Sequence, residues 1–175
     1  MSDLIPRPTH GDVVELVLDD HRLFEELLRQ LRDETQDRDG LRRLLSRVLV
    51  AHAEAEEKEV YPSLRREDAI SGGEAEHGTH EHDEGHEALL GVLEVDDTGS
   101  EEFSTAVHEL SEALHHHLDE EERDILNPAR TEITETVREE LGAAFAAERT
   151  AQLEADCGTV DNVRRLVERA KRRTR

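Results

Sequence analysis

Apolar residues recur every three or four positions along most of the chain, the spacing that places them on one face of an α-helix. Charged residues fill most of the positions between them. This pattern predicts four long helices and a fifth helix, over about residues 12–35, 41–64, 81–95, 101–126 and 132–155. The segment after Gly158 would form a short amphipathic basic helix or a frayed tail. Runs of β-branched residues are few, so the pattern predicts no sheet.

The segments between these helices carry turn signals. The Gly-, Glu- and His-rich stretch "SGGEAEHGTHEH" from Ser71 predicts the long connection between the second and third helices. Ser100 predicts an N-cap, and Asn127-Pro128 predicts the end of the fourth helix. We therefore expect an all-α fold, with an up-and-down four-helix bundle over residues 1–130. Residues 131–175 would form an additional C-terminal helix with a basic tail.

The composition favours a highly charged surface over a small aliphatic core. Charged residues make up 38% of the chain and aromatic residues 2%, so the core must consist of Leu, Val, Ile and Ala. The net charge is −22, yet residues 160–175 contain seven bases and two acids. An acidic body repels nucleic acid and anionic membranes and attracts cations. We expect no nucleic-acid or membrane partner. The basic tail would contact the acidic body, dock a protein partner or remain solvated.

The sequence shows neither a targeting signal nor a membrane-spanning segment. Its first residues lack a basic and apolar signal segment, and no apolar run approaches the ~20 residues that cross a membrane. The single cysteine, Cys157, allows no internal disulfide. These features favour a cytoplasmic protein.

A repeat with an offset of 65 residues runs through the four long helices. The stretch "HAEAEEKEVY" from His52 matches "HLDEEERDIL" from His117, with a glutamate four residues after each histidine. The same offset relates His21 to His86, and 31 residues separate the two histidines of each half. The repeat predicts two αα-hairpins related by a pseudo-two-fold axis, with a histidine on every helix facing one centre.

The spacing within the repeat predicts metal binding. Residues four apart share a helix face, so each histidine and its glutamate point the same way, towards the apolar stripe. Buried glutamates cost several kcal/mol unless they are paired, and cations between them would remove that cost. His82, one turn before His86, has Val17 as its counterpart in the repeat and adds a fifth imidazole.

The count of donors divides them between two metal ions. One ion would have three imidazoles, the other would have two, and two carboxylates would bridge them. These groups are His82, His86 and His117, then His21 and His52, and as bridges Glu56 and Glu121. The ion with two imidazoles would keep an open position, where a small molecule can bind. Nitrogen and oxygen donors without thiolate suit Fe, Mn or Zn, and two carboxylate bridges favour an iron pair.

The ordered motifs resemble a known family. Asp20-His21-Arg22, His52-x3-Glu56, His82-x3-His86 and His117-x3-Glu121 are similar to those of the hemerythrin-like, or HHE cation-binding, domain, over roughly residues 12–128. The resemblance implies a four-helix bundle with a non-haem centre of two iron ions, bridged by an oxo or hydroxo group, and the same seven ligands. Some members place the last carboxylate five residues after its histidine, so Glu122 is the alternative to Glu121. Asn127 stands where the first half has Pro62.

The resemblance implies a binding protein that binds or senses dioxygen, or a related small molecule such as nitric oxide, and we favour this over an enzyme. The first alternative is a di-iron protein that detoxifies peroxide or stores iron. A positioned proton donor would support it, and we interpret Tyr61 as a packing residue at the end of the second helix, with a place at the border of the site as the alternative. The second alternative is a non-redox divalent metal buffer that uses the histidines of residues 74–82. His10, His77, His80 and His108 are interpreted as surface residues, and His115 and His116 as solvated or as partners of a ligand.

Overall fold

The computed structural model describes residues 5–173, and within this range it contains helices and turns but no strand. The helices are α1 (Val13–Leu31), α2 (Arg38–Ala55), α3 (Tyr61–Arg66), α4 (Gly72–Glu94), α5 (Glu101–Glu121), α6 (Asn127–Glu132), α7 (Glu135–Glu154) and α8 (Val160–Arg173). Two π-helical turns, η2 (Glu56–Val60) and η3 (Glu122–Leu126), join α2 to α3 and α5 to α6. The prediction of an all-α fold is confirmed. The two ends of the chain, including the last residues of the basic tail, lie outside the described range.

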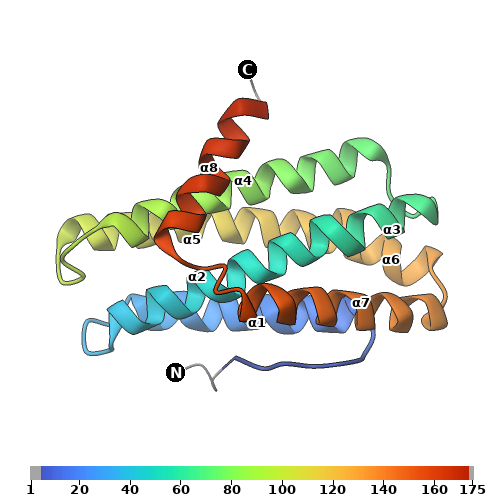
Figure 1. Ribbon diagram of the computed structural model, residues 1–175, viewed down its shortest axis with the longest axis horizontal. Coiled ribbons are helices and arrows are strands. Elements are labelled where there is room, and N and C mark those ends of the chain that lie inside the picture. The colour runs from blue at the N-terminus through green and yellow to red at the C-terminus, as the bar shows by residue number, and fades with distance from the viewer. Residues whose placement is uncertain (1–4, 174–175) are drawn as a thin grey trace.

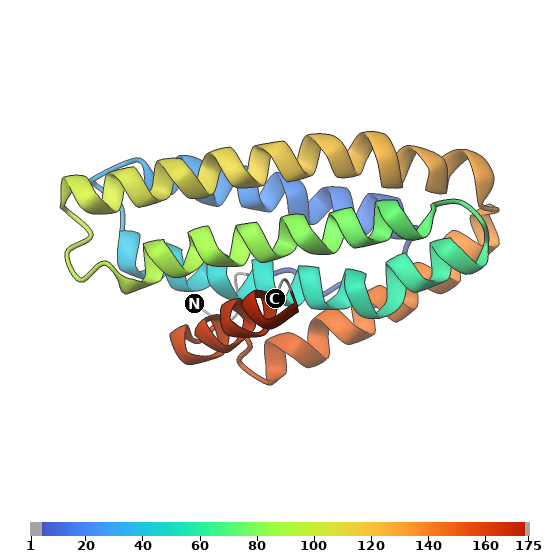
Figure 2. The same ribbon diagram turned by 90° about the horizontal axis from the view of Figure 1, so that it is seen from above.

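The long helices lie side by side as a helical bundle (Figures 1 and 2). Aliphatic residues and Phe24 and Phe103 fill the space between them and are buried. The apolar stripes read from the sequence therefore face the core. No helix in the described part of the chain is both long and apolar enough to cross a membrane.

The connection predicted from Ser71 is wrong, because the chain is already helical from Gly72. The Ser71 side chain accepts from the Glu74 backbone N–H, and the Glu74 side chain accepts in return from the Ser71 backbone N–H. This capping box starts a helix in a stretch whose composition resembles a loop. Tyr61 packs directly against Gly78 inside this helix and leaves no space for a larger side chain there. The third long helix is thus nine residues longer than predicted at its start, since 81 minus 72 is nine.

The two helices after residue 130 pack closely on the bundle. Helix α7 lies along α1 and α2, and α8 crosses α4 (Figure 1). Phe145 of α7 and Val163 of α8 are fully buried and belong to the apolar core. Basic side chains of α8 contact acidic ones of α4, with Arg164 at 2.8 Å from Glu94 and Lys171 at 2.7 Å from Glu87. The C-terminal segment therefore supports the bundle through both apolar packing and charge.

The two π-helical turns occur at related places in the two halves. In η2 the backbone N–H of Tyr61 donates to the carbonyl of Glu56, and in η3 that of Asn127 donates to the carbonyl of Glu122. A proline stands two residues after the end of each turn, at positions 62 and 128. A proline ring clashes with the carbonyl four residues earlier in a regular helix, and the wider turn relieves that clash. Such turns are frequent at functional sites, and both adjoin the buried glutamates.

Candidate metal centre

The residues predicted as metal ligands are all buried in the middle of the bundle. Their exposed fractions lie between 0% and 5%, for His21, His52, Glu56, His82, His86, His117 and Glu121. They come from all four long helical segments, as the repeat predicted. Seven ionisable side chains in an otherwise apolar interior require compensation, because buried charges are costly unless paired.

The ligand atoms gather in two groups that share one carboxylate. Glu56, His82, His117 and Glu121 offer atoms within 4.8 Å of one another, and so do His21, His52 and Glu121. Glu56 also lies between the groups, with its Oε2 atom 3.1 Å from His52 Nε2 and 3.2 Å from His82 Nε2. The nitrogen of His86 lies outside both groups. This arrangement is suited to two cations bridged by carboxylates.

Most of the atoms that face the centre make no hydrogen bond within the described protein. These atoms are Nε2 of His21, His52, His86 and His117, both carboxylate oxygens of Glu56, and Oε2 of Glu121. Buried polar atoms almost always form hydrogen bonds, and several of these atoms contact only one another, so a set of this kind around one space needs an explanation. Imidazole nitrogens and carboxylate oxygens are metal donors, and cations between them would pair with the members of the two groups.

The outward nitrogen of each imidazole in these two groups contacts a carboxylate. The Nδ1 distances are 3.1 Å from His52 to Asp20, 3.0 Å from His117 to Glu81, 2.8 Å from His82 to Glu57 and 3.2 Å from His21 to Glu122. A carboxylate at Nδ1 holds the proton there and leaves the Nε2 lone pair directed at the centre. Metal-binding histidines are commonly oriented in this way. The sequence places Glu57 and Glu122 on solvated faces, with an outer contact to an imidazole as the alternative, and the structure shows that contact.

The contacts change the internal alignment of the repeat. His82 lies between Glu56 and Glu57 as His21 lies between Glu121 and Glu122. His82 is therefore the counterpart of His21, at an offset of 61 residues, and the predicted match of His21 with His86 is wrong. The difference of four residues is close to one helical turn, so both alignments keep the histidine on the same face. His86 is the additional imidazole that breaks the symmetry.

The pKa values of the buried histidines depend on the carboxylates and the cationic side chains around them. Burial lowers the pKa of His52, but Glu56 and Asp20 outweigh burial and raise it to about 10. Burial acts in the same way on His82, where Glu56 and Glu57 raise the pKa to about 10. Burial, and then the positive charges of His82 and the nearby arginines, lowers the pKa of His86 to about 3. Without metal, two imidazolium groups neutralise the carboxylates, and metal ions would take over that role.

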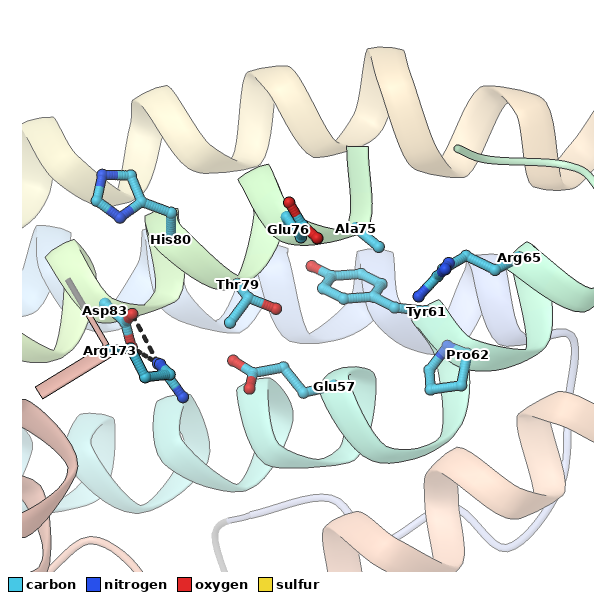
Figure 3. Close-up of a pocket in the computed structure, with 10 residues that line it drawn as sticks. All are labelled: Glu57, Tyr61, Pro62, Arg65, Ala75, Glu76, Thr79, His80, Asp83 and Arg173. Atoms are coloured by element: carbon cyan, nitrogen blue, oxygen red, sulfur yellow. Dashed lines mark hydrogen bonds and ion pairs between the residues drawn. The ribbon is translucent and has the colours of Figure 1, made fainter. Parts of the chain in front are cut away.

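Tyr61 borders the centre, which is the alternative to the packing role favoured from the sequence. Its hydroxyl donates to Glu121 Oε1 at 2.7 Å and lies 3.4 Å from His82 Nε2. Burial, then the charges of Glu121 and Glu56, raises its pKa well above the usual value, so the hydroxyl keeps its proton. Figure 3 shows the ring pointing from α3 towards α4 in a surface pocket whose wall also includes Arg173 and Asp83.

Two groups that support the ligands were not among the predicted site residues. Glu81 holds His117, and Asp20 holds His52 while accepting two hydrogen bonds from Arg149 of α7. The sequence contains a signal for both acids, because each stands directly before a centre histidine, in Asp20-His21 and Glu81-His82. No local pattern identifies Arg149, which lies 129 residues from its partner.

The protein is thus a helical bundle that buries two groups of histidine and glutamate donors, which places it in the class of metal-binding helical bundles. The model of one family, described as the hemerythrin HHE cation binding domain, matches residues 12–129. The chain belongs to this family, as the motifs predicted. No match was found among curated proteins or among solved structures.

Proposed function

We propose that the protein holds two iron ions in a hemerythrin-like four-helix bundle and binds or senses dioxygen, or a related molecule such as nitric oxide. The observation that supports this most is the pair of buried ligand groups that share Glu121. In this proposal His82, His86 and His117 would hold one iron, His21 and His52 would hold the other, and the carboxylates of Glu56 and Glu121 would serve both. When bound, the iron pair supplies reversible redox chemistry towards a diatomic ligand.

The surroundings of the centre favour a very small and uncharged ligand. A cavity of about 10 Å³ adjoins His52, His82, His86 and His117, and its other walls include Phe24, Leu49 and Leu114. That volume is close to the minimum that holds a single water molecule. The apolar side chains of Phe24, Leu49 and Leu114 keep this space small and exclude large substrates, and a diatomic molecule would need the surrounding side chains to adjust.

Metal analysis combined with an optical spectrum tests this proposal. The protein is reduced without oxygen, its metal content is determined, and its spectrum is recorded before and after exposure to air. We expect two irons per chain and a near-ultraviolet and visible band that appears with oxygen and disappears when oxygen is removed. One zinc ion per chain, or iron without any oxygen-dependent band, would contradict the proposal.

Peroxide turnover is the second candidate, and Tyr61 is the observation that favours it. The Tyr61 hydroxyl lies 2.7 Å from Glu121, a proposed bridging carboxylate, so the centre has a positioned hydrogen-bond donor beside it. The discriminating experiment compares peroxide consumption by the iron-loaded protein, by its Tyr61→Phe variant and by the same concentration of free iron. Consumption well above that of free iron, and much slower in the variant, would favour the enzyme. Equal rates would favour the binding protein.

A further inference from the structure

A second cluster of histidine and glutamate lies on the outer side of α4 and α5. His77 and Glu81 are four residues apart on α4, and His116 and Glu120 are four residues apart on α5. Each pair has the His-x3-Glu spacing of the central ligands. Nε2 of His77 is 2.6 Å from Glu120 and 3.7 Å from Glu81, and Nε2 of His116 is 3.6 Å from Glu81 and 3.7 Å from Glu120. His77, Glu81 and Glu120 offer atoms within 4.8 Å of one another, and His116 lies beside the two carboxylates of this group.

Glu81 provides an independent indication that this point receives a ligand. Its side chain is only 4% exposed, and its Oε2 atom accepts from Nδ1 of His117. Its Oε1 atom is buried, has no hydrogen-bond partner within the described protein and faces the imidazoles of His77 and His116. An unpaired buried carboxylate oxygen is costly, and a cation at the point that both imidazoles approach would remove the cost.

We propose that His77, Glu81, His116 and Glu120 form an outer site for a divalent transition-metal ion of the zinc type. Two imidazoles and two carboxylates, without thiolate, match the donor set and the fourfold coordination that zinc accepts. Calcium and magnesium prefer oxygen donors alone, so the imidazoles argue against them. None of the four residues belongs to the two central groups. The outer site is therefore separate from the centre.

The position of the cluster gives an ion direct access from solvent. The side chains of His77 and His116 are 55% and 62% exposed, and that of Glu120 is 24% exposed. A cavity of about 200 Å³ opens beside them, with walls that include His77, Glu81 and Glu120. An acidic protein concentrates cations near its surface, which favours occupation of such a site. Buried Glu81 anchors the ion, and the exposed side chains close around it.

Calorimetric titration with Zn²⁺ tests the outer site on the full chain. The central metal content of each preparation is measured first, so that zinc bound outside the centre is counted separately. In His77→Gln/His116→Gln we expect the loss of one zinc equivalent. Losing a residue that only hydrogen-bonds a metal ligand lowers metal affinity by about 10- to 100-fold, and loss of the two histidines should lower the zinc affinity of the outer site by more than that. Both histidines are largely exposed, so the variant should fold normally. Glu81 remains unchanged because it also holds His117.

A matched control distinguishes this site from binding to the acidic surface in general. His80 and His108 are also exposed and lie 3.3 Å and 3.5 Å from a glutamate four residues on. In the described part of the chain neither forms an ion pair with Glu81 or Glu120, as His77 and His116 do. His80→Gln/His108→Gln should therefore bind Zn²⁺ like the native protein. The proposal is overturned if both variants lose zinc equally, or if His77→Gln/His116→Gln binds it unchanged. The number of zinc ions bound at the outer site is measured separately from the central metal, so this test does not depend on whether the centre holds iron.

Discussion

Arg149 forms two hydrogen bonds with Asp20, from Nε to Oδ2 at 2.7 Å and from Nη2 to Oδ1 at 2.6 Å. Both side chains are almost completely buried. Asp20 in turn contacts Nδ1 of His52, so α7 is connected to the candidate metal centre through one carboxylate. Arg149 lies beyond residue 129, where the family match ends. The C-terminal segment therefore orients a proposed ligand as well as covering the bundle.

Replacing Arg149 with methionine should destabilise the protein and weaken metal retention. Removal of one partner of a buried ion pair typically costs about 3–5 kcal/mol, because the other charge stays buried. Arg130→Met is a suitable control, since Arg130 pairs with Glu15 at the surface and such pairs contribute at most about 1 kcal/mol. Chemical denaturation and metal analysis after dialysis measure both effects. Equal stability of the two variants would show that Asp20 is held by other groups.

Glu121 rather than Glu122 should be the carboxylate that bridges the metals. Glu121 belongs to both ligand groups and its side chain is 1% exposed. Glu122 is half exposed and contacts only the outward nitrogen of His21 among the centre histidines. Glu121→Gln should therefore lose most of the central metal, whereas Glu122→Gln should reduce affinity by about 10- to 100-fold, as for other outer partners. Greater loss of metal in Glu122→Gln would instead support a bridge five residues after the histidine.

The metal-free protein should lose stability as the pH rises. The pKa values of His52 and His82 are raised from 6.5 to about 10 by their carboxylate partners. A raised pKa contributes stability that is complete below pH 6.5 and disappears by about pH 10. The free energy of unfolding of the metal-free protein should fall across that window. Metal affinity should increase as the pH rises across the same window, because ligation requires neutral imidazoles.

Denaturation of metal-free protein at a series of pH values measures this effect. The variant His52→Gln/His82→Gln serves as the control, because it lacks both imidazoles and should show a much flatter profile between pH 6.5 and 10. A native profile as flat as that of the variant would mean that the two histidines are neutral in the metal-free protein.

Periodicity and spacing predicted much of the fold and of the candidate site. Leu45, Leu89 and Leu110 lie on the predicted stripes and are completely buried. The histidine and glutamate pairs could be assigned to one face because i and i+4 positions coincide in any helix. The same property concealed the correct partner of His21, since a shift of one turn changes no face. Sequence patterns specify faces better than they specify register along the helix axis.

Contacts that depend on tertiary structure could not be predicted. The helical start at Gly72 contradicts its local composition, because its capping box and burial on the bundle outweigh the low helix propensity of glycine. The π-helical turns have no period of their own in the sequence, although a proline follows each of them. Arg149 becomes a partner of the site only because α7 folds back along α1 and α2.

Replacing Gly78 with alanine should displace Tyr61 from Glu121. A Cβ atom at position 78 would lie 2.9 Å from the Tyr61 hydroxyl oxygen and 3.0 Å from the ring carbon that carries it. Tyr61 is buried and hydrogen-bonded, so the ring cannot move without losing its contact with Glu121. Overpacking of this kind typically costs about 1–3 kcal/mol. At Gly91 of the same helix nothing lies within 4 Å, and Gly91→Ala should stabilise the protein by about 0.5–1 kcal/mol.

A double-mutant cycle separates displacement of the hydroxyl from other effects of the added methyl group. Tyr61→Phe removes the atom closest to position 78, so Gly78→Ala should cost less in the Tyr61→Phe background than in the native protein. Urea denaturation of the two single variants and the double variant gives this difference. The optical spectrum of the metal-loaded Gly78→Ala protein should also resemble that of Tyr61→Phe, because both variants remove the hydrogen bond to Glu121. Additive costs and a spectrum like that of the native protein would show that the tyrosine ring adapts without leaving its carboxylate partner.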